Sequence, residues 1–319
     1  RMHIRVALFI IYMMICTPLY FLHIIVIGML LVRPAFSSSF YSFFIYAGVI
    51  DLTYFTMNVF FYYLPFLPGV MEFYARFQDH ESNADWRPEY SWMLSIANML
   101  MYYLPAIQDA TNLMISLNRI LALLCPFMYR RVFTRPLTLL MIVSTTFIAL
   151  IACFVTIGAP GYFVDISYDK FTEKIYLMHA DSNVHFPSIN RSTLVSAYSF
   201  TCNGICFIIY CVSAACIIRS KAVNLNEVRL FLLGFFVLLS SAPSIAYQIY
   251  WSIYDSKGSA QVFMLLPWVI MVKTLASPLL LILTNSGMRN EIRSLLPRAF
   301  RGRVKESIIR DFSGTSAKF

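Results

Sequence analysis

Seven long apolar segments occupy most of this chain and constrain its fold more than any other feature. They cover residues 6–32, 40–66, 92–124, 137–158, 193–218, 229–254 and 262–284. A bilayer core is about 30 Å thick and a helix rises about 1.5 Å per residue, so about 20 apolar residues cross it. Lipid offers no hydrogen bonds to the backbone, and membrane strands are about half as long as these segments. The sequence therefore predicts an all-α integral membrane protein with a seven-transmembrane-helix bundle.

The composition supports a single membrane domain. Hydrophobic residues make up 59% of the chain and charged residues 13%, against about 45–50% and 25% in soluble domains. The first apolar segment is too long for the core of a signal peptide, so we expect it to be the first helix. We predict one domain over residues 1–300 and a disordered cytoplasmic tail over 301–319.

Basic residues predict the orientation. Seven helices place the termini on opposite sides, and the loops on the C-terminal side, with the tail, hold fifteen Lys and Arg against four acids. The opposite set holds eight basic residues against ten acids. Because basic residues gather in cytoplasmic loops, we predict the N-terminus outside and the C-terminus in the cytoplasm. The net charge of +9 then reflects an inner face suited to anionic membrane lipids, with no nucleic acid as partner.

Modification and metal signals are sparse. The one N-glycosylation sequon begins at Asn190, in the second predicted outer loop. All seven cysteines lie within or at the end of apolar segments, so we expect no disulfide framework outside the membrane. Those in the fifth helix have no neighbouring His or acid, so we predict small buried side chains and no metal.

Four ionisable residues other than His lie inside the apolar segments: Asp51, Asp109, Arg119 and Lys273. A charged side chain inside a membrane costs several kcal/mol unless it is paired or hydrated, so each of these four residues predicts a functional site. Asp51 and Lys273 lie at equal depth, about 16 Å from the cytoplasmic boundary. Their opposite charges predict an ion pair between the second and seventh helices, which either fixes packing or acts as a switch. Asp109 lies about 25 Å below the outer end of its helix, so we predict a polar contact within the bundle or an ion site with Asp51.

A lysine in the last helix is also compatible with a retinal Schiff base. Lys273 lies five residues before Pro278, a shorter separation than in opsins. We therefore expect no retinal and no other cofactor.

The strongest local motif closes the third helix. Residues 117–121 are Leu-Asn-Arg-Ile-Leu, residues 125–127 are Cys-Pro-Phe, and the basic pair Arg130 and Arg131 follows. From the cytoplasmic mouth, Arg119 can reach the interface and donate hydrogen bonds to a partner. Pro126 ends the helix and presents the loop.

The stretch from Met114 to Phe127 resembles the Asp-Arg-Tyr region of G-protein-coupled receptors. It is more similar still to the nematode serpentine chemoreceptors of the gamma superfamily, as are residues 266–268, 276–281 and 285–289 in helix 7 and its exit. The resemblance implies a chemosensory receptor of the plasma membrane that binds a small molecule in the outer half of the bundle. It also implies activation of a heterotrimeric G protein at the basic inner face, through Asn118, Arg119, Arg130 and Arg131.

Several positions depart from the rhodopsin-like pattern. Asn118 stands where most receptors carry an acid, so the local lock between an acid and Arg119 cannot form. No tyrosine lies three residues beyond Pro278, and Ser241 stands near Pro243 where many receptors place a tryptophan. These departures predict a divergent chemoreceptor.

Aromatic residues are frequent in the outer halves of the third, sixth and seventh helices. Aromatic rings with few polar groups suit a small apolar or amphipathic molecule. We predict that Tyr103, Gln248 and Trp268 bind the ligand. For Trp251 and Tyr254 we prefer an interfacial aromatic belt.

Residues 285–300 predict a short amphipathic helix after the seventh helix. Its apolar side chains, Met288, Ile292, Leu295 and Leu296, are expected to face the membrane. Arg289 and Arg293 are expected to face the lipid headgroups.

Other classes of function fit less well. A transporter should show inverted repeats with broken helices, and a pore in one chain needs more charge than two acids and a lysine. A ligand-gated channel subunit or a seven-helix transporter stays the alternative, and the oligomeric state is open. We predict no enzyme, because His23, the one His within an apolar segment, has no catalytic neighbours in the sequence.

Overall fold

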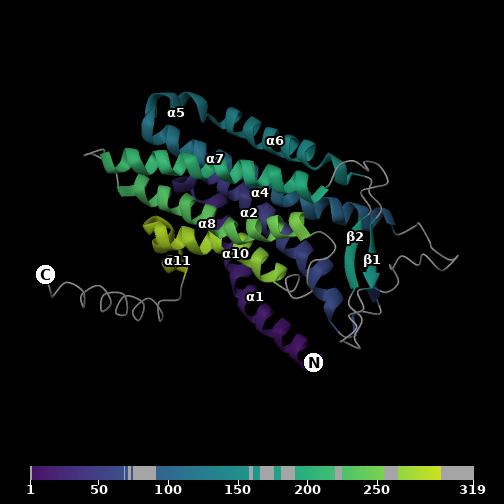
Figure 1. The fold of residues 1–319 in the computed structure, drawn as a ribbon. Helices are drawn as coiled ribbons and strands as arrows, with labels where there is room; N and C mark the ends of the chain where they lie inside the picture. The colour runs from purple at the N-terminus through teal and green to yellow at the C-terminus, as the bar shows by residue number, and fades with distance from the viewer. Residues whose placement is uncertain are drawn as a thin grey trace.

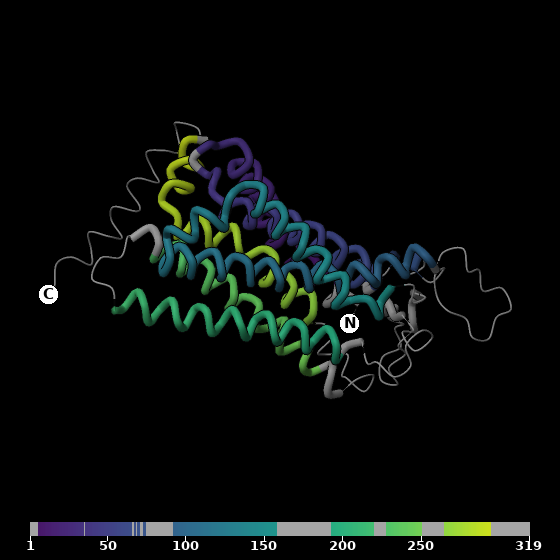
Figure 2. Tube along the Cα trace, turned by 90° about the horizontal axis from the view of Figure 1, so that it is seen from above, coloured from purple at the N-terminus to yellow at the C-terminus, as the bar shows by residue number. Residues whose placement is uncertain are grey.

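In the computed structural model, the described residues form seven long helices, one for each predicted apolar segment. Most of them run side by side along the bundle, while the N-terminal helix is inclined to the others (Figures 1 and 2). The structure describes residues 2–67, 69–70, 73–74, 91–157, 161–165, 176–180, 191–219, 225–254 and 265–295. Within these residues the predicted all-α bundle is confirmed. The long helices are α1 (Met2–Val32), α2 (Ser39–Asn58), α4 (Ser91–Leu124), α6 (Arg135–Ala152), α7 (Arg191–Arg219), α8 (Leu225–Tyr254) and α10 (Leu266–Thr284).

The second apolar segment, predicted as a helix over 40–66, changes its geometry before its end. Regular helix stops at Asn58 and continues as a π turn, η2 (Val59–Tyr63), and a 3-10 turn, η3 (Leu64–Phe66). Pro65 lies in that 3-10 turn and has no N–H to donate, so the ladder of α-helical hydrogen bonds cannot continue through it. The other short elements are η1 (Pro34–Phe36), α5 (Pro126–Val132), η5 (Phe154–Thr156) and α11 (Ser286–Leu295).

A β-hairpin that the sequence did not predict lies in the long connection before α7. Strands β1 (Gly161–Asp165) and β2 (Tyr176–Ala180) are antiparallel, with Gly161 opposite Ala180. Both strands contact α4, and β2 also contacts η2 and η3. Figure 1 shows the hairpin at the opposite end of the bundle from α5 and α11.

Helix α4 lies at the centre of the bundle. It packs against α2, α6, α7 and α8, and every residue from Leu104 to Thr111 is buried. By contrast, α6 buries only Thr138, Thr145 and Ala149. The other six long helices are long and apolar enough to cross a membrane, whereas α4 is more polar. A helix surrounded by protein can carry polar side chains that lipid would not tolerate.

Helix α11 packs against the bundle, which corrects the expected position of its apolar side. Met288 is completely buried in a cluster that includes Met29, Leu30 and Phe40, and Ile292 packs against the same cluster. Met288 therefore faces protein and not lipid. The side chains of Leu295 and Leu296 lie outside the described ones.

Polar contacts fix the junction between α10 and α11. Asn285 Nδ2 donates to the Tyr41 hydroxyl on α2 at 2.7 Å, and its Oδ1 accepts the backbone N–H of Met288 at 3.2 Å. Arg289 Nη1 donates to the backbone carbonyl of Ile282 at 3.1 Å. Arg289 thus turns back onto the end of α10, where unpaired helix carbonyls accept a cation well.

Candidate functional site

A buried ion pair lies at the centre of the bundle. Nζ of Lys273 on α10 is 3.0 Å from Oδ1 of Asp109 on α4, and the two side chains are 3% and 1% exposed. Asp109 Oδ2 accepts a hydrogen bond from Ser199 Oγ on α7 at 2.5 Å. Low polarity around such a pair strengthens the attraction and makes either charge costly when it is left alone. These contacts tie α4, α7 and α10 together at one depth.

Asp51 does not form the predicted ion pair with Lys273. Its Oδ1 accepts from Gln108 Nε2 at 2.5 Å, and its Oδ2 accepts from Ser277 Oγ at 3.2 Å. Gln108 and Asp109 are consecutive on α4 and so lie about 100° apart around the helix axis. Gln108 therefore meets α2 while Asp109 meets α7 and α10. The prediction from equal depth was wrong because depth does not determine which way a side chain points.

We call these residues the central cluster: Asp51, Gln108, Asp109, Ser199, Lys273 and Ser277. Asp51 and Lys273 do line one shared cavity, of about 20 Å³, together with Gln108, Asn112 and Ser277. That volume is about enough for one water molecule, and the lining is polar enough to hold it.

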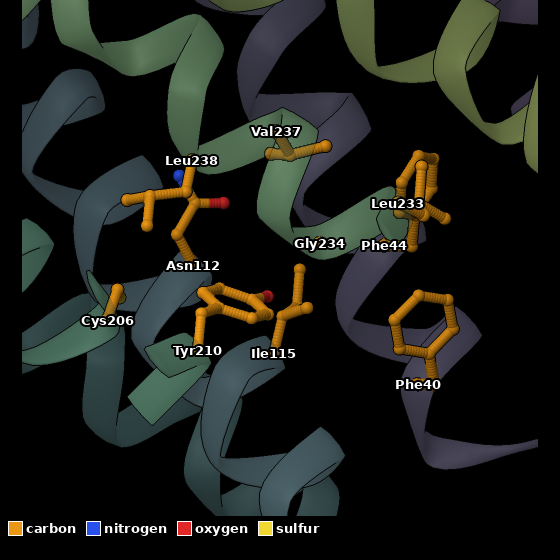
Figure 3. A pocket seen from close by; sticks show the side chains of 10 residues that line it. All are labelled: Phe40, Phe44, Asn112, Ile115, Cys206, Tyr210, Leu233, Gly234, Val237 and Leu238. Atoms are coloured by element: carbon orange, nitrogen blue, oxygen red, sulfur yellow. The ribbon is translucent and has the colours of Figure 1, made fainter. Parts of the chain in front are cut away.

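A second, smaller cavity of about 10 Å³ adjoins the first (Figure 3). The two share Phe44, Asn112, Ile115 and Val237. Figure 3 shows the Tyr210 ring beside Ile115 and the backbone of α8 at Gly234. A Cβ atom at position 234 would collide with the Tyr210 hydroxyl, so only glycine leaves room for it here.

A second polar cluster lies at the end of α4 next to α5. Arg119 is 4% exposed. Its Nε and Nη2 donate to Asn118 Oδ1 at 3.2 Å and 2.5 Å. Its guanidinium carbon is 4.3 Å from the centroid of the Phe40 ring, a cation–π distance.

Asn118 connects this arginine to two other elements. Its Nδ2 donates to Ser39 Oγ on α2 at 2.9 Å, and Ser39 Oγ shares a hydrogen bond with the Tyr129 hydroxyl on α5 at 3.1 Å. We call Ser39, Phe40, Asn118, Arg119 and Tyr129 the inner cluster. An acid is not needed at position 118 for a contact with Arg119, because the amide oxygen accepts in its place.

The other two residues of the predicted coupling face lie apart from the inner cluster. Arg130 and Arg131 are both exposed on α5. The structure thus brings Asn118 and Arg119 together and leaves this basic pair on the surface. The role of all four in G-protein coupling stays a prediction.

The three predicted ligand-binding residues make their contacts in different places. The Tyr103 hydroxyl donates to the backbone carbonyl of Thr146 on α6 at 3.1 Å. Trp268 packs edge-on against the Tyr12 ring of α1, with ring centroids 5.3 Å apart. Gln248 accepts a hydrogen bond at its backbone carbonyl from the Ser196 hydroxyl on α7. The buried side-chain Oε1 of Gln248 has no hydrogen-bond partner among the described residues. Their joint role in ligand binding stays a prediction.

Some predicted features lie outside the described residues. These are the glycosylation residue Asn190, the tail 301–319 and the side chains of Trp251 and Tyr254. Among the described residues, no group of three or more His, Cys, Asp or Glu side chains could hold a metal ion.

The bundle and both polar clusters fall within one family match. A family model described as the serpentine type seven-transmembrane G-protein-coupled chemoreceptor Srv matches residues 9–297. The chain belongs to the Srv family. No curated protein of similar sequence was found. Srv membership confirms the predicted class, a nematode serpentine chemoreceptor. The matched family is Srv, whereas the sequence resemblance pointed to the gamma superfamily.

Srv membership also decides two broader predictions. The family is one of receptors and not of enzymes, as predicted. A serpentine receptor crosses the membrane several times, so this Srv-family chain is a multi-pass membrane protein. Helix α4 supplies residues to both the central and the inner cluster.

Proposed function

We propose that this Srv-family chain is a chemosensory receptor of the plasma membrane, with its N-terminus outside and its C-terminus in the cytoplasm. A small molecule binds in the outer half of the bundle, at Tyr103, Gln248 and Trp268. A heterotrimeric G protein binds the opposite end through Asn118, Arg119 and the exposed basic pair of α5. Membership of the gamma superfamily belongs to the same proposal.

The buried Arg119 is the observation that carries the proposal. Hydrogen bonds to the neutral amide of Asn118 hold its guanidinium, and Asn118 is tied to α2 and, through Ser39, to α5. Separation of these elements breaks the contacts and exposes the arginine to a partner. A ligand shifts the balance between the two arrangements only as far as it binds one of them more tightly.

The central cluster provides packed contact between the proposed outer half of the bundle, where the ligand binds, and the half that carries the inner cluster. Its hydrogen bonds and ion pair join α2, α4, α7 and α10. Helix α2 and helix α4 also carry the inner cluster, so a change in their relative position reaches Arg119 through rigid elements.

The test is G-protein activation in cells that express the receptor with a panel of Gα subunits. Arg119→Ala is compared with the wild type at matched surface level, and Arg219→Ala serves as the control, because Arg219 is an exposed arginine at the end of α7. We expect basal or odorant-evoked activation to be lost in Arg119→Ala and kept in Arg219→Ala. Full surface expression with no activation of any Gα, together with an odorant-gated current, would instead favour a channel.

A further inference from the structure

Helix α5 presents an apolar and basic face to its surroundings. Phe127 is 85% exposed and Met128 is 55% exposed, and Arg130 and Arg131 are exposed as well. Residues three and four positions apart are neighbours on a helix, so Phe127 lies between the two arginines. Tyr129 faces the other way and bonds to α2. One side of α5 is therefore docked on the bundle, and the other is open.

The positive charge of this face has little compensation nearby. No Asp or Glu occurs in the sequence between Asp109 and Asp165, and Arg135, the first residue of α6, adds a third exposed arginine. In the parts of the chain that the structure describes, these arginines form no salt bridge. By contrast, Arg33 is 3.3 Å from a Glu291 carboxylate oxygen. Three guanidinium groups are thus open to an external anion.

The exposed apolar side chains continue a lipid-facing surface. Helix α6 can cross a membrane over Arg135–Ala152, and its first turns expose Leu137 by 40%, Leu139 by 63% and Leu140 by 58%. Because α5 ends just before this candidate span begins, we expect it at the level of the lipid headgroups. Apolar side chains beside arginines at that level are typical of helices that lie in the membrane interface.

We propose that α5 and the start of α6 bind the headgroup of an anionic phospholipid of the inner leaflet. In the resting receptor, before a G protein engages the basic pair of α5, Arg130, Arg131 and Arg135 bind the phosphate oxygens of this lipid, for which planar guanidinium groups are well suited. Phe127 anchors the helix among the acyl chains. The site rests on the proposed orientation, which places this end of the bundle in the cytoplasm. Through Tyr129, a lipid bound to α5 also holds the inner cluster in place.

Native mass spectrometry of the purified full-length protein in detergent tests the site, by counting bound lipid. The protein is titrated with phosphatidylinositol 4,5-bisphosphate or with phosphatidylcholine. The test variant is Arg130→Gln/Arg131→Gln/Arg135→Gln. The matched control, Arg33→Gln/Arg219→Gln/Arg293→Gln, removes the same formal charge from other parts of the predicted inner side. Thermal unfolding of each variant checks that it is folded.

We expect the wild type to prefer the anionic lipid and the control to bind it as the wild type does. Each basic residue near an anionic surface contributes about a fivefold factor, so the test variant should bind about a hundredfold more weakly. Phe127→Ser, which keeps every charge, should weaken binding as well because the acyl anchor is lost.

Three results would overturn the site. They are the absence of any preference for the anionic lipid, equal weakening in the test and control variants, and loss of G-protein activation in the test variant with lipid binding unchanged. The last result would place a protein on α5 and would support the proposed function. Lipid is counted with no G protein present, so failure of the receptor to activate any Gα leaves this test intact.

Discussion

In the central cluster the buried cation, Lys273, lies 3.0 Å from a carboxylate. In the inner cluster the contacts of Arg119 with other described residues include the neutral amide of Asn118 and the ring of Phe40. Breaking a buried ion pair leaves an unpaired charge, and that penalty is large. Exchanging a hydrogen bond to an amide for one to a partner is a smaller change. From this comparison we expect the centre of the bundle to be held firmly and the end that carries the inner cluster to rearrange more readily.

The largest expected effect comes from breaking the ion pair of the central cluster. Asp109→Asn removes the carboxylate beside Lys273 and leaves a buried ammonium, which should lower the free energy of unfolding by about 3–5 kcal/mol. Thermal unfolding of the purified protein in detergent measures it. Adding Lys273→Met to Asp109→Asn should restore most of the loss. A double variant no more stable than the single one would show that the pair is not what stabilises the centre.

The next effect tests the changeable side. Asn118→Leu removes the acceptor for Arg119 and the donor to Ser39, which should lower the free energy of unfolding by about 1–2 kcal/mol and raise basal G-protein activation. Asn118→Asp should do the opposite to basal activation, because a carboxylate binds the guanidinium more strongly than an amide does. If both variants showed the same basal activation at matched surface level, Asn118 would not stabilise the inactive arrangement of the receptor.

A smaller effect is expected at Asp51, within the central cluster itself. Asp51→Asn keeps an oxygen for Gln108 and gains an N–H that can donate to Ser277. It removes a carboxylate that lines a cavity with Lys273 but does not pair with it. The free energy of unfolding should change by about 1 kcal/mol or less. Thermal unfolding of Asp51→Asn beside Asp109→Asn makes the comparison direct. If both variants lost stability equally, Lys273 would depend on both acids.

The smallest effect is expected at Ser39, the link from Asn118 to Tyr129. Ser39→Ala should lower the free energy of unfolding by about 0.6 kcal/mol, the usual size of a side-chain hydrogen bond within a membrane protein. Ser42→Ala is the matched control, because the exposed Ser42 hydroxyl bonds only weakly to its own helix, at 3.5 Å. If Ser42→Ala lowered the unfolding temperature as much as Ser39→Ala, the hydrogen bonds of Ser39 would not stabilise the inner cluster.

Sequence reasoning found the charged residues of both clusters and Asn118, but not the serines that bond to them. Asp51, Asp109, Arg119 and Lys273 stand out because charge is rare in apolar helices. Ser39, Ser199 and Ser277 do not stand out, since serines in membrane helices often bond to their own backbone, as Ser144 does to the Leu140 carbonyl. Only the facing helix shows which serine has a carboxylate or an amide within reach.

The amino-acid sequence by itself determined the number of long helices and the depth of each charged residue, because these depend on composition and on the rise per residue. The tertiary structure decided the partner of Lys273, the burial of Met288 against the bundle and the position of the hairpin at one end of the bundle. Each of these depends on how a helix is rotated about its axis or on which distant segments meet. Packing against neighbouring helices sets those quantities, and no periodicity within a single segment records them.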